Sequence, residues 1–104
     1  MEYDILKTFA DGVWKVKLTG EIDIYNSSDV KTVLARLMEE QAADVHIDCE
    51  ELEYIDSTGL GALVGALKNV KNHNKEMCLK NVKPNILKLF HITNLDKVFV
   101  IEED

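Results

Sequence analysis

The sequence contains little proline, glycine or cysteine, and no long apolar run. Its 104 residues include one proline, five glycines and two cysteines. Without a Pro-, Ser- or Gly-rich stretch or an internal repeat, a chain of this length predicts one domain over residues 1–104. No apolar segment approaches a membrane span, and the N-terminus is acidic where a secretory signal is basic. We therefore expect a cytoplasmic protein that does not contact the membrane.

Metal-binding and redox motifs are also lacking. Cys49 and Cys78 have no CxxC spacing and no histidine partner at ligand spacing, so we interpret both as buried thiols. The three histidines, His46, His73 and His91, are scattered and form no recognisable triad or cluster. The sequence therefore predicts neither a metal site nor a cofactor, and the histidines are interpreted as structural or solvated.

Basic residues are outnumbered, with 12 Lys and Arg against 19 Asp and Glu, which gives a formal net charge of −7. A surface of this sign repels phosphate backbones and anionic lipid headgroups. We therefore expect no direct nucleic-acid partner. The apolar fraction of 46% is enough to build a hydrophobic core.

Apolar periodicity predicts strands and helices in alternation. Apolar and polar residues alternate on both sides of Asp11-Gly12, which indicates a β-hairpin. A helix over 27–41 follows, then a strand over 45–49, an irregular acidic stretch over 50–53 and a second helix from residue 56. A strand at 77–79, a short helix opened by Pro84 and a strand at 98–101 complete the chain.

This order predicts an α/β fold. Helices between most strands imply βαβ crossovers, and the N-terminal hairpin makes the first strand pair antiparallel. We expect one mixed β-sheet with the helices packed on it.

Ser57 stands where a strand ends and a helix begins, close to unpaired helical N–H groups. One interpretation is that Asp56 or Ser57 only caps the helix. The other is that Ser57 accepts a phosphoryl group, whose negative charge would face the positive end of the helix dipole. Glu53 and Asp56 would oppose that charge. The residues alone leave both interpretations open.

The segment Ile55–Gly61, with sequence IDSTGLG, resembles the signature of anti-sigma factor antagonists, the stand-alone STAS domains of bacteria. Leu18–Asp23 resembles the turn that follows the family's second strand, and Leu89–Phe99 resembles its C-terminal segment. The resemblance therefore covers essentially the whole domain.

The resemblance implies the STAS fold and a partner-switching function. The unphosphorylated protein would bind an anti-sigma factor that is also a serine kinase and so release a sigma factor. Phosphorylation of Ser57 by that kinase would switch the protein off, and a PP2C-type phosphatase would reset it. The implied partner-binding residues are Asp23, Asp56, Ser57, Thr58, Gly59 and Gly61. The kinase would supply the base, ATP and Mg²⁺, so the chain itself is not expected to be an enzyme.

Three points stay open in the sequence. Thr58 is a second candidate acceptor, although it lies one residue further into the helix. Gly61 and Gly65 are explained either by packing or by close approach of a partner. The alternative function is a STAS module that binds a small ligand, or scaffolds a signalling or transport complex, with Ser57 as a cap. A serine hydrolase is disfavoured because the Gly-x-Ser-x-Gly elbow is absent.

Overall fold

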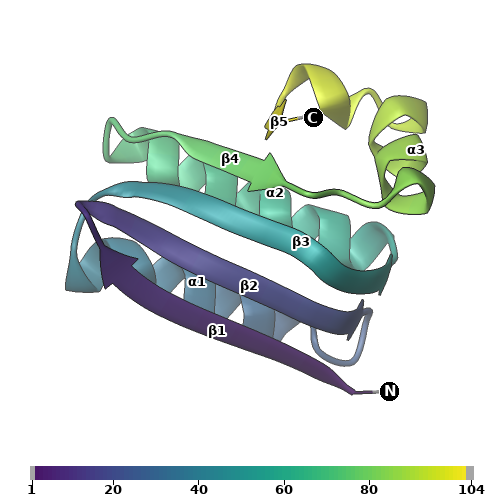
Figure 1. Cartoon of the computed structure of the whole chain (residues 1–104), viewed down its shortest axis with the longest axis horizontal. Coiled ribbons are helices and arrows are strands. Elements are labelled where there is room, and N and C mark those ends of the chain that lie inside the picture. The colour runs from purple at the N-terminus through teal and green to yellow at the C-terminus, as the bar shows by residue number, and fades with distance from the viewer. Residues whose placement is uncertain (1, 103–104) are drawn as a thin grey trace.

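The protein is a five-stranded sheet with helices α1 and α2 on one face. The computed structural model describes residues 2–102. In chain order the elements are β1 (Tyr3–Ala10), β2 (Val13–Ile22), α1 (Ser27–Glu40), β3 (Asp44–Ile55), α2 (Ser57–Asn72), β4 (Met77–Lys80), α3 (Pro84–Ile92), the 3-10 helix η1 (Leu95–Lys97) and β5 (Val100–Glu102). The sheet order is β1-β2-β3-β4-β5, with β1 and β2 antiparallel and the remaining pairs parallel (Figure 1). The predicted α/β fold with a mixed sheet is confirmed.

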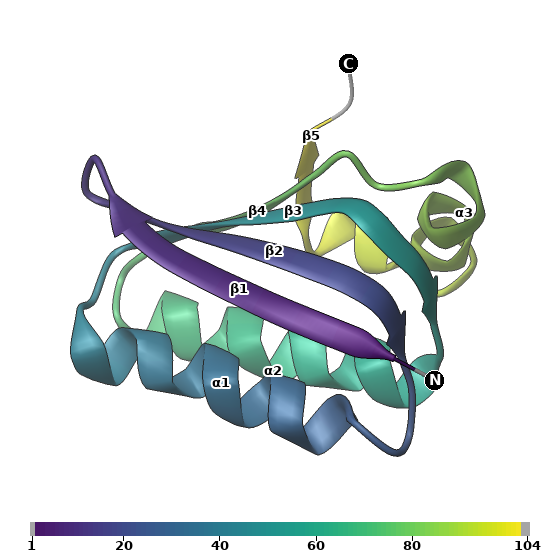
Figure 2. The same cartoon turned by 60° about the horizontal axis from the view of Figure 1, so that its bottom comes forward.

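The two long helices run side by side beneath the sheet, and α3 lies beyond the C-terminal end of β4 (Figure 2). Because β2 and β3 are parallel, the helices that follow them both begin at the edge where these strands end. The first turns of α1 and α2 are therefore brought together, although about 30 residues separate them in the sequence.

The core forms where the apolar faces of the helices meet the inward side chains of β2 and β3. Trp14 anchors one end of this core, since its indole Nε1 donates a hydrogen bond of 2.8 Å to the Gln41 carbonyl oxygen. The helix residues in the core are Val30, Leu34, Leu37 and Met38 of α1 and Leu60, Ala62, Leu63, Ala66, Leu67 and Val70 of α2. Val33 and Val64 on the same two helices are only half-buried.

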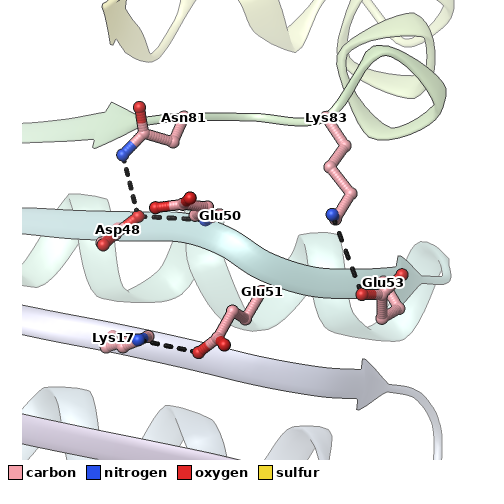
Figure 3. Close-up of polar contacts among 7 residues, drawn as sticks. All are labelled: Lys17, Asp48, Glu50, Glu51, Glu53, Asn81 and Lys83. Carbon is pink, nitrogen blue, oxygen red and sulfur yellow. Dashed lines mark hydrogen bonds and ion pairs between the residues drawn. The ribbon is translucent and has the colours of Figure 1, made fainter.

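The prediction of an irregular stretch over 50–53 is wrong. Strand β3 continues through this stretch to Ile55, and Leu52 is 1% exposed. Two register shifts against β2 accommodate additional β3 residues, so the alternation of buried residues is interrupted while the pairing continues. Two of the outward acids form ion pairs: Lys17 Nζ on β2 lies 2.7 Å from Glu51 Oε2, and Lys83 Nζ, directly before α3, lies 3.7 Å from Glu53 Oε1 (Figure 3).

Two smaller predictions also need correction. The last strand covers Val100–Glu102 rather than 98–101, because Phe99 turns into the core and meets the ring of Phe90 at 5.4 Å. Cys49 is buried as predicted, and burial raises its pKa to about 12. Cys78 is only half-buried.

The predicted hairpin turn is confirmed. Asp11 and Gly12 have φ angles of 56° and 77°, which is the left-handed region that a two-residue hairpin turn requires. Within residues 2–102, no helix combines the length and apolar character needed to cross a membrane.

Helix α2 approaches β2 and β3 closely at Gly59. A Cβ added there would lie 2.5 Å from Ile55 Cγ1 and 3.0 Å from the Ile22 carbonyl oxygen, whereas one added at Gly61 would meet open space. We therefore expect Gly59→Ala to lower the free energy of unfolding by about 1–3 kcal/mol. The control Gly61→Ala should be neutral, or stabilising by about 1 kcal/mol. Urea unfolding of both variants tests this, and equal free energies would contradict the packing role of Gly59.

Candidate functional site

Asp56 is the N-cap of α2, and its side chain organises the first turn. Its Oδ1 accepts hydrogen bonds from Thr58 Oγ1 at 2.6 Å and from the Gly59 backbone N–H at 3.0 Å. The Asp56 backbone N–H donates to the Ile22 carbonyl oxygen at 3.2 Å, which fastens the junction to the end of β2. Of the two possible caps considered from the sequence, Asp56 is the one that the structure shows.

Ser57 is consequently not needed as a cap. It is the first residue of α2, it is exposed, and no hydrogen bond within residues 2–102 occupies its hydroxyl. Thr58 is half-buried and its hydroxyl is already bonded to Asp56. Of the two neighbouring hydroxyls, that of Ser57 is the accessible one.

The Asp56 carboxylate remains charged near neutral pH. The Thr58 hydroxyl, followed by the Gly59 N–H, holds the pKa of Asp56 below its usual value, and these hydrogen bonds outweigh the opposing effect of partial burial. A carboxylate with a lowered pKa is a poor proton acceptor. Asp56 therefore supplies negative charge and structure beside Ser57.

The loop between β2 and α1 is held by its own polar residues. Asp23 Oδ1 accepts from the Tyr25 backbone N–H at 2.9 Å, and the Asp23 N–H donates to Asn26 Oδ1 at 3.0 Å. Asn26 Nδ2 donates to the Glu21 carbonyl oxygen at 2.8 Å. Asn26 is 5% exposed, so this polar side chain is buried with its hydrogen bonds satisfied.

This loop and the start of α2 form one surface. The Asp56 N–H bond to the Ile22 carbonyl oxygen brings the start of this loop to the cap, and the nearby Ile24 backbone contributes to the lowered pKa of Asp56. Between the two helix starts lies a shallow pocket of about 230 Å³, lined by Ser27, Ser28, Lys31, Thr58, Gly61 and Ala62.

The structure brings the predicted partner-binding residues into this surface, with different exposures. Ser57 and Gly61 are exposed, while Asp23, Asp56 and Thr58 are half-buried. Gly59 is buried, so close packing explains why a glycine stands there, and its contact with a partner stays a prediction. Across the described residues, no group of three or more His, Cys, Asp or Glu side chains is arranged to hold a metal ion.

Sequence reasoning missed two residues of this surface. The side chains of Ile24 and Tyr25 are 66% and 90% exposed. The available signal was an apolar pair placed after the strand ended, between the turn-forming residues Asp23 and Asn26. It was missed because apolar residues usually indicate burial.

Comparison with known proteins gives a match to the family model of the STAS domain over residues 4–104. The chain belongs to the STAS domain family. A full-length relative of this STAS domain is the anti-sigma-B factor antagonist of Staphylococcus aureus, 34% identical over 103 residues, which are 99% of this chain and 95% of the relative.

Solved structures share the fold at lower identity. An anti-sigma factor antagonist from Mycobacterium paratuberculosis is 23% identical with a TM-score of 0.83, covering 99% of this chain and 87% of its own. The Bacillus anti-sigma factor antagonist SpoIIAA matches in its unphosphorylated form with a TM-score of 0.74, at 16% identity and 99% and 89% coverage. Its phosphorylated form matches with a TM-score of 0.72, at 17% identity and 99% and 93% coverage.

The capping role of Asp56 predicts a pH dependence of stability. Because its pKa is lowered in the folded protein, the ionised form stabilises the fold above the unfolded pKa of about 3.9, and this contribution is lost as the pH falls through the lower folded value. Asp56→Asn keeps an oxygen acceptor for the cap but not the charge. We expect wild type to be more stable at pH 7 and the difference to shrink below about pH 4. Parallel stability profiles from pH 7 to pH 3 would contradict this.

Proposed function

We propose that this STAS domain, over residues 1–104, is a cytoplasmic anti-sigma factor antagonist switched by phosphorylation of Ser57. Unphosphorylated, it binds an anti-sigma factor that is also a serine kinase and so releases a sigma factor. The observation that carries the proposal is the exposed Ser57 hydroxyl, freed from capping by Asp56. The antagonist names of its full-length relatives support the same role.

The surface around Ser57 is suited to docking a kinase rather than to catalysis by this chain. Asp56 is committed to the cap, and the kinase would supply the base, ATP and Mg²⁺. Asp23, Thr58, Gly59 and Gly61 complete the proposed partner-binding set. A PP2C-type phosphatase would remove the phosphoryl group.

Added charge would change docking more than folding. A phosphoserine carries about −1.5 to −2 charges, which the start of a helix tolerates because they face the positive end of its dipole. In an interface the same charge is costly to desolvate and stands beside Asp56. SpoIIAA keeps a similar fold in both of its forms, with TM-scores of 0.74 and 0.72 against this chain, which supports a switch without refolding.

The proposal is tested by capturing partners from native cell extract with ATP present. Wild type and Ser57→Ala should retain the same serine kinase, because the surface stays uncharged at residue 57, whereas Ser57→Glu should lose it. Thr8→Glu is the control, since Thr8 is exposed on β1 and pairs with Lys15 near the hairpin turn, whereas the start of α2 is bonded to Ile22 at the opposite end of β2. Mass spectrometry of the wild type that has released the kinase should locate phosphate on Ser57.

Two results would contradict the proposal. Retention of the same proteins by wild type and Ser57→Glu would remove the charge switch and favour the alternative of a ligand-binding or scaffolding STAS module. A phosphate located on Thr58 would reassign the acceptor.

Gly61 provides a separate test of the docking surface. Because a side chain added at Gly61 meets open space, Gly61→Leu should fold normally while occupying space that the partner needs. We expect the affinity for the captured kinase to fall by about ten-fold or more. Lys71→Leu, at an exposed position in the last turn of the same helix, should bind as wild type does. Unchanged affinity of Gly61→Leu would remove Gly61 from the interface.

A further inference from the structure

Tyr25 and Ile24 form an apolar pair at the tip of the β2–α1 loop. Tyr25 is 90% exposed, more than any other large hydrophobic residue among residues 2–102, and Ile24 is 66% exposed. Single exposed apolar residues are normal on a protein surface. Here two exposed apolar residues are adjacent at a loop tip, and one is an aromatic residue of the type found at the energetic centre of protein interfaces.

The backbone beneath this pair is fixed before any partner arrives. Two hydrogen bonds hold the loop from both sides. The Tyr25 N–H donates to Asp23 Oδ1 at 2.9 Å, and the Asp23 N–H donates to Asn26 Oδ1 at 3.0 Å. The buried Asn26 side chain also fastens the loop to the Glu21 carbonyl oxygen at 2.8 Å. A pre-organised loop loses little conformational entropy on binding. More of the free energy gained by burying its exposed side chains therefore contributes to affinity.

The pair is continuous with the surface that carries Ser57. The loop starts directly after Ile22, whose carbonyl oxygen accepts from the Asp56 N–H at 3.2 Å. The Ile24 backbone also lies near enough to the Asp56 carboxylate to help lower its pKa, and Asp56 is the residue next to Ser57. A protein that covers Ser57 therefore lies within reach of the loop tip.

The charges around the pair indicate the chemistry of its partner. Asp23 adjoins the pair, Asp56 is bonded to Ile22 directly before the loop, and Asp29 lies in the first turn of α1, where its Oδ2 accepts from the Tyr3 hydroxyl at 3.2 Å. The chain as a whole carries a formal net charge of −7. A complementary surface would therefore place basic side chains around an apolar pocket.

We infer that Ile24 and Tyr25 are the apolar anchor by which the anti-sigma factor kinase is recognised, inserting into a pocket of that protein rimmed by Lys or Arg side chains. The inference rests on the proposed function, and it goes further by naming the residues and the partner chemistry that determine affinity. It also gives the pair a part in phosphorylation, because the kinase that binds the loop is then positioned at Ser57.

The test uses the purified serine kinase that wild type retains and Ser57→Glu does not. Titration calorimetry should show that Tyr25→Ala raises the dissociation constant about 30-fold and Ile24→Ala about ten-fold. Tyr25→Phe should bind as wild type does, because the ring rather than the hydroxyl is buried. Ile92→Ala is the matched control, since Ile92 is also 66% exposed but lies at the end of α3, and its dissociation constant should change less than two-fold.

Phosphorylation kinetics provide a second measurement. With the same kinase, Ile24→Ala and Tyr25→Ala should raise the KM for the antagonist while kcat stays within two-fold, since the reacting Ser57 is untouched. Circular dichroism should show wild-type folding, and Ile24→Thr with Tyr25→Ser serves as a second pair if either alanine variant is unfolded.

The outcomes separate the two proposals. If the Ser57-dependent kinase binds the loop variants as tightly as wild type, the anchor is overturned and the proposed function stands. If no kinase is retained in a Ser57-dependent manner, the proposed function is overturned and the anchor with it. A selective loss of affinity in the loop variants, with Ile92→Ala unchanged, supports both.

Discussion

The hydrogen bonds of the Asp56 carboxylate hold the start of α2, and the candidate site depends on them. One carboxylate oxygen accepts hydrogen bonds from both the Thr58 hydroxyl and the Gly59 N–H, so these two groups near Ser57 are already bonded within the fold. The backbone of Asp56 is fastened to Ile22 at the end of β2. Ser57 is left as an exposed hydroxyl at a rigid helix start. The capping and switch interpretations are therefore compatible, because different residues carry them.

The parallel pairing of β2 with β3 determines what surrounds Ser57. Because both strands end at the same edge, their following segments meet there, which is also where α/β proteins commonly place their binding sites. Gly59 allows α2 to lie against Ile22 and Ile55, and Asn26 holds the β2–α1 loop in place. The surface is thus assembled from backbone geometry and buried polar bonds, and the exposed side chains are left free to contact a partner.

Periodicity was sufficient to predict the α/β fold, the hairpin and both long helices, since these elements keep a regular spacing of buried residues. It failed in the second half of β3, where Cys49, Leu52 and Ile55 are buried three residues apart. Register shifts cause this spacing, and they depend on pairing with β2 that no local pattern records. The residues of the candidate site were predicted through the motif around Ser57. Ile24 and Tyr25 were not, because residue type alone does not show that a loop holds an apolar side chain outward.

The shared edge of β2 and β3 also has a consequence for stoichiometry. The residues proposed to contact a partner lie at one end of the molecule, on segments joined by the Asp56 to Ile22 bond. Under the proposed function, this one surface would bind a single partner molecule per copy. Under the proposed function, the output would follow the number of unmodified copies, as in a titration, so a cell would grade the response by copy number while each molecule is either on or off.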